Sequence, residues 1–291
     1  MSGPMSTQPA RVAVVIPARD EAARVAATVR AAGKVPAVDL VVVVDDGSRD
    51  ATAVCAQEAG AVVVGHHRPR GKAAALATGA QAVSAIEARE NPSEPRHLLF
   101  LDADLAETAA RAEPLVRPVL DGTADLTIAV MPPQTAGPGG GHGFVVRLAR
   151  AGIDRATGWQ ASQPLCGQRC LSRPALDAAG PLARGFGVEV GMTIDLLRRG
   201  FRVAEVPVDF QHRVTGADLR GQLHRGRQWL HVAEALARRG VVPLSAVPTL
   251  PAFATTTARR ASDAPPSGPE ADADAGPDAG ADPPRRDRRT N

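Results

Sequence analysis

The sequence contains no tyrosine, few aromatic side chains of any kind and only three cysteines. Aromatic residues make up 3% of the 291 positions, so a hydrophobic core has to be built mainly from valine, leucine and alanine, within an apolar content of 44%. Cys55, Cys166 and Cys170 are too few for a disulfide framework and show no metal-type spacing with histidine. We therefore expect reduced, buried thiols, which are typical of a cytoplasmic protein.

The sequence also lacks a long apolar run and a strong excess of charge. No stretch of about 18 apolar residues occurs, so no transmembrane helix is expected. The apolar stretch Val12–Pro17 is too short for the core of a signal peptide. A formal net charge of +3, with acidic and basic residues interleaved, is too small to indicate nucleic-acid binding. These absences predict a soluble protein and remain compatible with phosphate-bearing substrates.

A repeated alternation of strand and helix patterns is present instead. Buried strands are predicted at 11–17, 39–45, 61–64, 97–101 and 125–130, and helices at about 18–32, 51–59, 72–88 and 109–120. Later in the chain, helices are predicted at 144–159, 187–199 and 218–239, and strands within 164–172 and 201–210. Short connections between alternating elements predict a doubly wound α/β fold, with a mixed, mostly parallel sheet and helices on both faces.

Both ends of the chain differ in composition from its middle. Residues 1–10 are expected to form a disordered leader. From 255 to 291 the sequence is rich in Pro, Ala, Gly, Asp and Arg without periodicity, which predicts a disordered tail. The Gly- and Pro-rich stretch 132–142 is predicted to be a mobile loop.

Two carboxylates follow the fourth predicted strand. Asp102 and Asp104 come directly after the apolar run that begins at His97, and residues two apart can converge on one site. Ligands of open α/β sheets bind at the carboxyl ends of the strands. Hard oxygen ligands suit Mg²⁺ or Mn²⁺ shared with a diphosphate, because such ions rarely sit in all-protein cages. The pattern also occurs in solvated acidic turns, so these residues alone leave both interpretations open.

Four short motifs occur in order along the first half: Val14-Val-Ile-Pro-Ala-Arg-Asp-Glu21, Val43-Val-Asp-Asp-Gly-Ser-Arg-Asp-Ala-Thr52, Gly71-Lys72 and Leu101-Asp-Ala-Asp104. Together they resemble family 2-type glycosyltransferases of the GT-A fold over roughly residues 11–130. Gly167-Gln-Arg169 resembles the Ser-Gly-Gln-Arg segment of polyprenyl-phosphate sugar transferases, with Cys166 in place of serine. The segments 185–191 and 205–213 resemble both dolichyl-phosphate mannose synthases and glucosyl-3-phosphoglycerate synthases.

The resemblance implies a metal-dependent hexosyltransferase that uses a UDP- or GDP-sugar. Residues 11–130 would bind the nucleotide sugar, and 131–254 would form the acceptor-binding half of the same domain. Mg²⁺ or Mn²⁺ would be held by Asp102, Asp104 and His212. The donor would be bound by Pro17, Ala18, Glu21, Asp45, Asp46, Gly71, Lys72, Asp102 and Ala103. Gln168, Arg169 and Arg213 would contact the acceptor or the diphosphate, and Glu189 and Asp104 would be catalytic.

Physical chemistry supports these roles without excluding plain structural ones. Lys72 begins a helix, where an anion would bind, but it could also be a solvated lysine. Glu189 could act as a general base if it faces the pocket, with a pKa raised by burial and lowered by the cation. The structural alternatives are a helix-start carboxylate for Glu21 and Glu189, a turn former for Asp46 and a core histidine for His212.

Two other functions would use a similar sheet or a similar ligand. Nucleotidyltransferases on a similar sheet carry a Gly-rich loop after the first strand, whereas residues 17–21 contain no glycine. A nucleotide-sugar- or partner-binding protein without turnover is disfavoured by the intact Asp102, Asp104 and His212. The sequence leaves open the sugar, the base, the acceptor, retention or inversion, and the oligomeric state, a homodimer included. A polyprenyl phosphate acceptor would bring the protein to the inner membrane face without a span, whereas a soluble phosphorylated acceptor would not.

Overall fold

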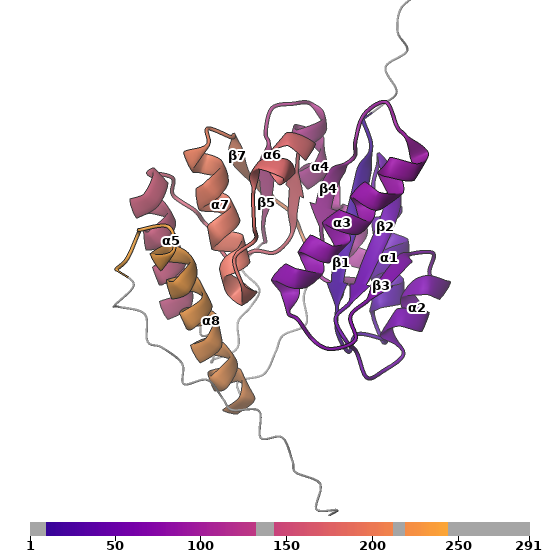
Figure 1. Ribbon diagram of the computed structural model, residues 1–291, viewed down its shortest axis with the longest axis horizontal. Coiled ribbons are helices and arrows are strands. Elements are labelled where there is room, and N and C mark those ends of the chain that lie inside the picture. The colour runs from indigo at the N-terminus through magenta and orange to yellow at the C-terminus, as the bar shows by residue number, and fades with distance from the viewer. Residues whose placement is uncertain (1–9, 132–142, 212–218, 244–291) are drawn as a thin grey trace, which may run out of the picture. The chain divides into compact units, whose positions relative to one another are not determined.

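The first half of the chain alternates between strands and helices, as its apolar pattern predicts (Figure 1). The computed structural model describes residues 10–131, 143–211 and 219–243, with only the backbone for 219–225. Most of the predicted leader, the stretch 132–142 and the predicted tail lie outside these residues. The elements up to the fourth strand are β1 (Val12–Ala18), α1 (Val25–Ala32), β2 (Val38–Asp45), α2 (Thr52–Glu58), β3 (Val62–Gly65), α3 (Lys72–Glu90) and β4 (His97–Phe100).

The second half contains five α-helices, two 3₁₀ segments and three further strands among its described residues. Its elements are the 3₁₀ helix η1 (Ala106–Ala112), α4 (Glu113–Leu120), β5 (Leu126–Val130), α5 (Phe144–Thr157), β6 (Arg169–Leu171), α6 (Arg173–Ala178), the 3₁₀ turn η2 (Gly185–Gly187), α7 (Val188–Arg198), β7 (Val203–Pro207) and α8 (Leu219–Ala237). Among the described residues, no helix is both long and apolar enough to cross a membrane.

The seven strands form one sheet in the order β3-β2-β1-β4-β6-β5-β7. Every neighbouring pair is parallel except those of β6, which runs antiparallel to β4 and β5. This mixed, mostly parallel sheet confirms the predicted fold class. Because Phe100 of β4 pairs with Arg169 of β6, the residues just before β6 lie at the edge where β1, β2 and β4 end. The reversed strand thus brings 166–168 to the predicted ligand-binding edge.

Helices cover both faces of the sheet at its centre. The residues of β1 from Val12 to Ile16 are completely buried, although successive side chains point to opposite faces. Helix α3 lies across β1 and β2 (Figure 1) and approaches closely at Gly79, where an added Cβ would lie 2.3 Å from Val15 Cγ1. Glycine is therefore required at this crossing, and α3 is held at a fixed distance from the strands that lead to the site.

A second hydrophobic cluster joins three helices of the second half. It includes Val145 and Ile153 of α5, Val190 of α7 and Leu236 of α8. An added Cβ at Gly152 would lie 2.4 Å from Leu236 Cδ2, so the backbone of α5 packs directly against the Leu236 side chain of α8. In Figure 1, α7 lies between this helix pair and the sheet, and it contacts both β7 and α8. This packing fixes the start of α7, which carries Glu189.

Two features of the fold differ from the sequence-based prediction. The first helix begins at Val25 rather than near Ala18, so Asp20 and Glu21 do not stand in its first turn. The second is α6, which the sequence analysis did not predict. It begins with Ser172 as its N-cap, whose Oγ accepts a hydrogen bond from the Ala175 amide.

Long-range hydrogen bonds explain the late start of α1. The amide of Asp20 donates to Ser48 Oγ, and the Asp20 carboxylate accepts from the Arg49 amide. The amide of Glu21 donates to Thr52 Oγ1 at 2.8 Å. These bonds hold residues 19–22 against the turn that follows β2, and the chain becomes helical only beyond them.

Candidate functional site at the carboxyl edge of the sheet

Lys72 lies between two carboxylates that come from distant parts of the chain. Its Nζ is 2.7 Å from Asp102 Oδ1 and 3.3 Å from Glu189 Oε1. Lys72 is the first residue of α3, Asp102 follows β4, and Glu189 stands in the first turn of α7. The structure therefore brings together three residues that the sequence predicted separately for donor binding, metal binding and catalysis. We call these three residues the Lys72 cluster.

Electrostatics keep the lysine of this cluster charged. Burial opposes the ammonium form, but the Asp102 and Glu189 carboxylates outweigh it and raise the pKa of Lys72 above its ordinary value. The Glu189 side chain is 7% exposed, whereas those of Lys72 and Asp102 are about one quarter exposed. With two formal negative charges and one positive, the Lys72 cluster is a partly open site that can attract a cation.

Gln168 and Cys166 extend the contacts of Asp102 into the core. Gln168 Nε2 donates a hydrogen bond to Asp102 Oδ2 at 2.7 Å, and Gln168 Oε1 accepts one from Cys166 Sγ at 3.0 Å. Burial raises the pKa of the Cys166 thiol to about 11, so the sulfur is protonated at neutral pH and can donate. Both residues are buried. Gln168 thus contacts a predicted metal ligand, a role that the sequence analysis did not assign to it.

Gly167 leaves the space that the lysine needs. A Cβ added at this position would lie 2.3 Å from Lys72 Nζ and 3.4 Å from both carboxylate oxygens of Asp102. The backbone of the segment before β6 therefore forms one wall of the Lys72 cluster. Any side chain here would compete with the ammonium for its place.

Thr28 holds the turn that carries Asp104 through two hydrogen bonds. Its hydroxyl donates to the Ala103 carbonyl at 2.7 Å and accepts from the Ala106 amide at 2.8 Å. Thr28 is completely buried in α1, while Asp104 is half-buried at the edge. The sequence analysis missed Thr28; the signal that could have found it is a hydroxyl residue on the apolar face of the predicted helix.

Asp46 stabilises the segment that leads into α3. Its carboxylate is buried and accepts hydrogen bonds from His66 Nδ1 and from the backbone amides of Arg70 and Gly71, each at 2.7 Å. His66 Nε2 lies 3.0 Å from Thr78 Oγ1. Both oxygens of the Asp46 carboxylate therefore accept hydrogen bonds from groups of the protein itself. These bonds make Asp46 a positioning residue for Lys72, and the predicted contact with a nucleobase stays a prediction.

The remaining predicted donor-binding residues lie along the same edge. Pro17 and Ala18 end β1, and Glu21 follows them half-buried. Asp45 Oδ1, at the end of β2, accepts from the Ser48 amide and hydroxyl. Gly71 has a φ of +89°, which disfavours other residues, and no atom lies within 4 Å of where its Cβ would be. The start of α3 is therefore open to a ligand.

Arg169 does not lie where the sequence analysis predicted it. Its guanidinium is completely buried and donates to the carbonyls of Cys166, Pro164 and Glu189 and to Thr193 Oγ1. Burial lowers its pKa. These contacts contradict a direct role with the acceptor or the diphosphate. Arg169 instead ties the segment before β6 to the first turn of α7.

Two of the three predicted metal ligands lie among the described residues. The described residues contain no group of three or more His, Cys, Asp and Glu side chains that could hold a metal ion. Asp102 and Asp104 supply two hard oxygen donors. The third predicted ligand, His212, lies outside the described residues, as does Arg213, the predicted contact for the acceptor or the diphosphate. This donor set fits Mg²⁺ or Mn²⁺, which bind through one or two carboxylates together with substrate phosphates.

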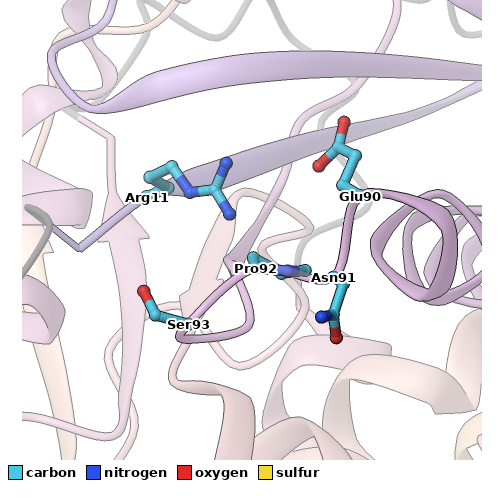
Figure 2. Close-up of a pocket in the computed structure, with 5 residues that line it drawn as sticks. All are labelled: Arg11, Glu90, Asn91, Pro92 and Ser93. Atoms are coloured by element: carbon cyan, nitrogen blue, oxygen red, sulfur yellow. The ribbon is translucent and has the colours of Figure 1, made fainter.

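Two cavities lie away from the Lys72 cluster. One, of about 380 Å³, is lined by Arg11 and by Glu90, Asn91, Pro92 and Ser93 (Figure 2). It lies where β1 and β4 begin, at the opposite edge of the sheet. The other, of about 600 Å³, is lined by α1, the end of α2 and η1. Neither is lined by a residue of the predicted site.

This chain is similar to known proteins in sequence and in structure. The model of glycosyl transferase family 2 matches residues 13–177, more than half of the chain. Glycosyltransferase AglJ of Haloferax volcanii is 29% identical over 189 residues, which cover 61% of this chain and 56% of AglJ. The chain therefore matches little more than half the length of this relative.

Solved structures of glucosyl-3-phosphoglycerate synthase from Mycobacterium tuberculosis are also similar. The complex with phosphoglyceric acid has a TM-score of 0.64 and 28% identity, covering 80% of this chain and 81% of that chain. The complex with Mn²⁺, UDP and phosphoglyceric acid has a TM-score of 0.62 and 26% identity, covering 80% of each.

Proposed function

The chain belongs to glycosyl transferase family 2, and on this basis we propose that it transfers a hexose from a UDP-sugar to a small phosphorylated acceptor with the help of Mg²⁺ or Mn²⁺. The observation that carries the proposal is the Lys72 cluster, because it gathers a cation and two carboxylates at the edge where such folds bind ligands. The similar enzyme from M. tuberculosis has been crystallised with UDP-glucose, Mn²⁺ and phosphoglyceric acid, which supports this donor and this acceptor class.

Three neighbouring segments would bind the donor: the loops after β1 and β2 and the start of α3. The residues after β1 and β2 are tied together by the Asp20–Ser48 and Glu21–Thr52 hydrogen bonds, so they form one rigid surface for the base and ribose. The open amino terminus of α3 at Gly71 presents the positive end of a helix dipole. A diphosphate bound there would also meet the Lys72 ammonium.

Asp102 and Asp104 would hold the divalent cation, with His212 as the third ligand that the sequence predicts. When bound, the cation would offset the negative charge that develops on the departing diphosphate. Gln168 and Lys72 each contact one oxygen of the Asp102 carboxylate, and Thr28 holds the backbone of the turn that carries Asp104.

Glu189 is the proposed acceptor-side carboxylate. It is buried, it stands 3.3 Å from Lys72 Nζ, and the Arg169 guanidinium holds its backbone carbonyl in place. In this position it would orient an acceptor hydroxyl or accept its proton. Arg213 remains the proposed contact for the acceptor or the diphosphate.

A polyprenyl phosphate is the second acceptor class, and it rests on the resemblance of Gly167-Gln-Arg169 to lipid-phosphate sugar transferases. That interpretation is weakened by the burial of Arg169, because the guanidinium does not face a ligand. A GDP-sugar is the alternative donor. Attachment to a membrane surface would accompany the polyprenyl phosphate acceptor, and a homodimer is a separate proposal with its own test. A sugar-nucleotide-binding protein without turnover is the non-catalytic alternative.

The test is a donor and acceptor screen with the full chain. UDP- and GDP-sugars are incubated with Mn²⁺ and with 3-phosphoglycerate, glycerol 3-phosphate or vesicles that contain polyprenyl phosphate, and nucleoside diphosphate release and product mass are measured. We expect release with a UDP-sugar and a soluble phosphorylated acceptor, lost in Asp102→Asn and after chelation. Binding of UDP without any release would support the non-catalytic alternative, and absence of both would overturn the proposal.

A further inference from the structure

Asp102 has a contact on each of its carboxylate oxygens. Lys72 approaches Oδ1 with a charged group, and Gln168 donates to Oδ2 with a neutral one, both at 2.7 Å. We propose that Gln168 is a positioning residue that fixes the rotation of the Asp102 carboxylate, and that Cys166 fixes the orientation of the Gln168 amide. This inference rests on the proposed role of Asp102 at the diphosphate and cation site.

The sheet topology places Gln168 beside Asp102. In the antiparallel pair, Phe100 of β4 faces Arg169 of β6. Asp102 lies two residues beyond Phe100, and Gln168 lies one residue before Arg169. If the pairing continued, Gln168 would stand opposite Leu101 and Gly167 opposite Asp102. The ladder ends at Phe100, however, and beyond it Gln168 Nε2 lies 2.7 Å from Asp102 Oδ2. Strand β6, which begins directly after Gln168, pairs with β4 on one side and with β5 on the other. The backbone of Gln168 is therefore held in place by the strand that follows it.

A glutamine amide can face either way, because its oxygen and nitrogen ends have nearly the same shape. Only one orientation suits Asp102, since a carboxylate can accept but cannot donate. Cys166 Sγ lies 3.0 Å from Gln168 Oε1, and its S–H can donate only to the oxygen end. Because sulfur is only a weak acceptor for the amide N–H groups, the thiol favours the orientation in which these groups face Asp102.

The same contacts argue against the acceptor role that the sequence analysis gave to Gln168. Gln168 is 1% exposed, and both ends of its side-chain amide have hydrogen-bond partners inside the protein. A neutral donor also differs from Lys72 in its effect, because it restrains the carboxylate without cancelling its charge. Partners of this kind, behind a metal ligand, commonly change metal affinity by about 10–100-fold when they are removed.

The test compares variants of Gln168 and Cys166 in the full chain. Gln168→Met keeps the length of the side chain but removes the donor, Cys166→Ala removes the thiol, and Cys166→Ser restores a donor at that position. Gln81→Met, an exposed glutamine of α3, is the matched control. Mn²⁺ affinity is measured by calorimetry in the presence of UDP, and KM and kcat are measured for donor and acceptor.

We expect Gln168→Met to weaken Mn²⁺ binding by about tenfold or more and to leave the acceptor KM unchanged. Cys166→Ala should weaken Mn²⁺ binding to a smaller degree, and Cys166→Ser should return it to the wild-type value. Unchanged Mn²⁺ affinity in Gln168→Met, or a raised acceptor KM alone, would overturn the inference. Should Gln168→Met fail to fold, equal affinities in Cys166→Ala and Cys166→Ser would overturn it instead.

A second readout works on the metal-free protein. The side-chain amide signals of Gln168, assigned by their loss in Gln168→Met, should exchange slowly with solvent and should shift in Asp102→Asn and in Cys166→Ala. Fast exchange and no shift would contradict the hydrogen bonds on which the inference rests. If the wild-type chain shows these signals but binds no UDP with Mn²⁺, then the proposed function has failed while the hydrogen-bond arrangement stands.

Discussion

Lys72 Nζ lies 2.7 Å from Asp102 Oδ1, although 30 positions separate the two residues along the chain. Lys72 begins α3, and Asp102 stands two residues beyond the end of β4. The contact therefore joins the positive end of a helix dipole to a carboxylate at the strand edge. Because Glu189 approaches the same ammonium, one side chain connects three elements of the fold.

Replacing Lys72 by methionine should remove this connection. The two carboxylates would then lose their shared counter-charge, and the diphosphate would lose a cation. We expect turnover to fall by at least about 100-fold, because a group that stabilises developing charge is lost. The free energy of unfolding should fall by only about 1–2 kcal/mol, since the pair is partly exposed.

Nucleoside diphosphate release and urea unfolding measure these two effects. The control is Lys34→Met, which changes the only other lysine of the sequence, an exposed residue after α1. Turnover at the wild-type rate in Lys72→Met would remove Lys72 from the site.

Gly167→Ala should displace the lysine without deleting it. The new Cβ would stand 2.3 Å from the present position of Nζ, so the flexible end of Lys72 has to move away from Asp102. We expect a 10- to 100-fold loss of kcat/KM, since small displacements at a reacting centre are costly. Gly226→Ala in α8, where nothing lies within 4 Å of the added atom, is the matched control. Equal activities of the two variants would contradict the proposed crowding.

Asp46→Asn should loosen the approach to α3. An amide has one acceptor oxygen and turns its N–H groups toward the donors of Arg70 or Gly71, which leaves buried polar groups without partners. We expect a loss of about 2 kcal/mol in the free energy of unfolding, together with a raised KM for the donor. Chemical denaturation and steady-state kinetics measure the two changes. A raised donor KM at wild-type stability would instead support the predicted contact with the nucleobase.

Arg169→Met should act on stability rather than on acceptor binding. The variant removes the hydrogen bonds that the guanidinium donates to three carbonyls and to Thr193 Oγ1, although the Glu189 carbonyl still accepts from the Thr193 hydroxyl. We expect a loss of about 3 kcal/mol or more, read as a lower melting temperature or denaturant midpoint. The acceptor KM, measured well below the transition, should change little. A variant of normal stability with a strongly raised acceptor KM would instead support a direct contact between Arg169 and the acceptor.

The buried thiols should make stability fall at alkaline pH. Burial raises the pKa of Cys166 to about 11 and also raises that of Cys170, both from an ordinary value of 9.0. Between about pH 9 and 11 the unfolded chain loses thiol protons that the folded chain keeps. The stability that each thiol contributes is thus complete below pH 9 and declines above it, by about 1.4 kcal/mol per pH unit for each thiol.

Urea unfolding from pH 7 to 10.5 measures this decline, and the absence of tyrosine removes the phenol groups that usually titrate in the same range. Cys170→Ala should be less stable than wild type at pH 7 but should show a shallower slope above pH 9. Parallel curves for the two proteins would contradict the assignment.

The sequence predicted the strands well because their signal is local. Val12–Ile16 and Val42–Val44 are continuous apolar runs, and each is a buried strand of the sheet. The edge location of Asp102 and Lys72 followed from the same signal, since parallel strands end on one side. The start of α1 was misplaced because its cause, the hydrogen bonds from residues 20–22 to 48–52, lies about 30 residues away.

The acceptor side of the site could be predicted only in part, for the same reason. Strand β6 has three residues, too few for its direction to be read from a pattern. Its reversal decides that Gln168 meets Asp102 while Arg169 is buried against α7. The meeting of Glu189 with Lys72 likewise depends on how α7 packs, which composition and spacing do not determine.

The strand order has a consequence for anyone who wishes to build chimaeras of this protein. Strand β5 has β6 and β7 as its only neighbours in the described sheet, and both follow it in the chain. A fragment cut after Val130 would carry β5 with no strand to pair with. Crossovers should therefore be made before Leu126, so that β5 travels with the strands that complete its hydrogen bonds.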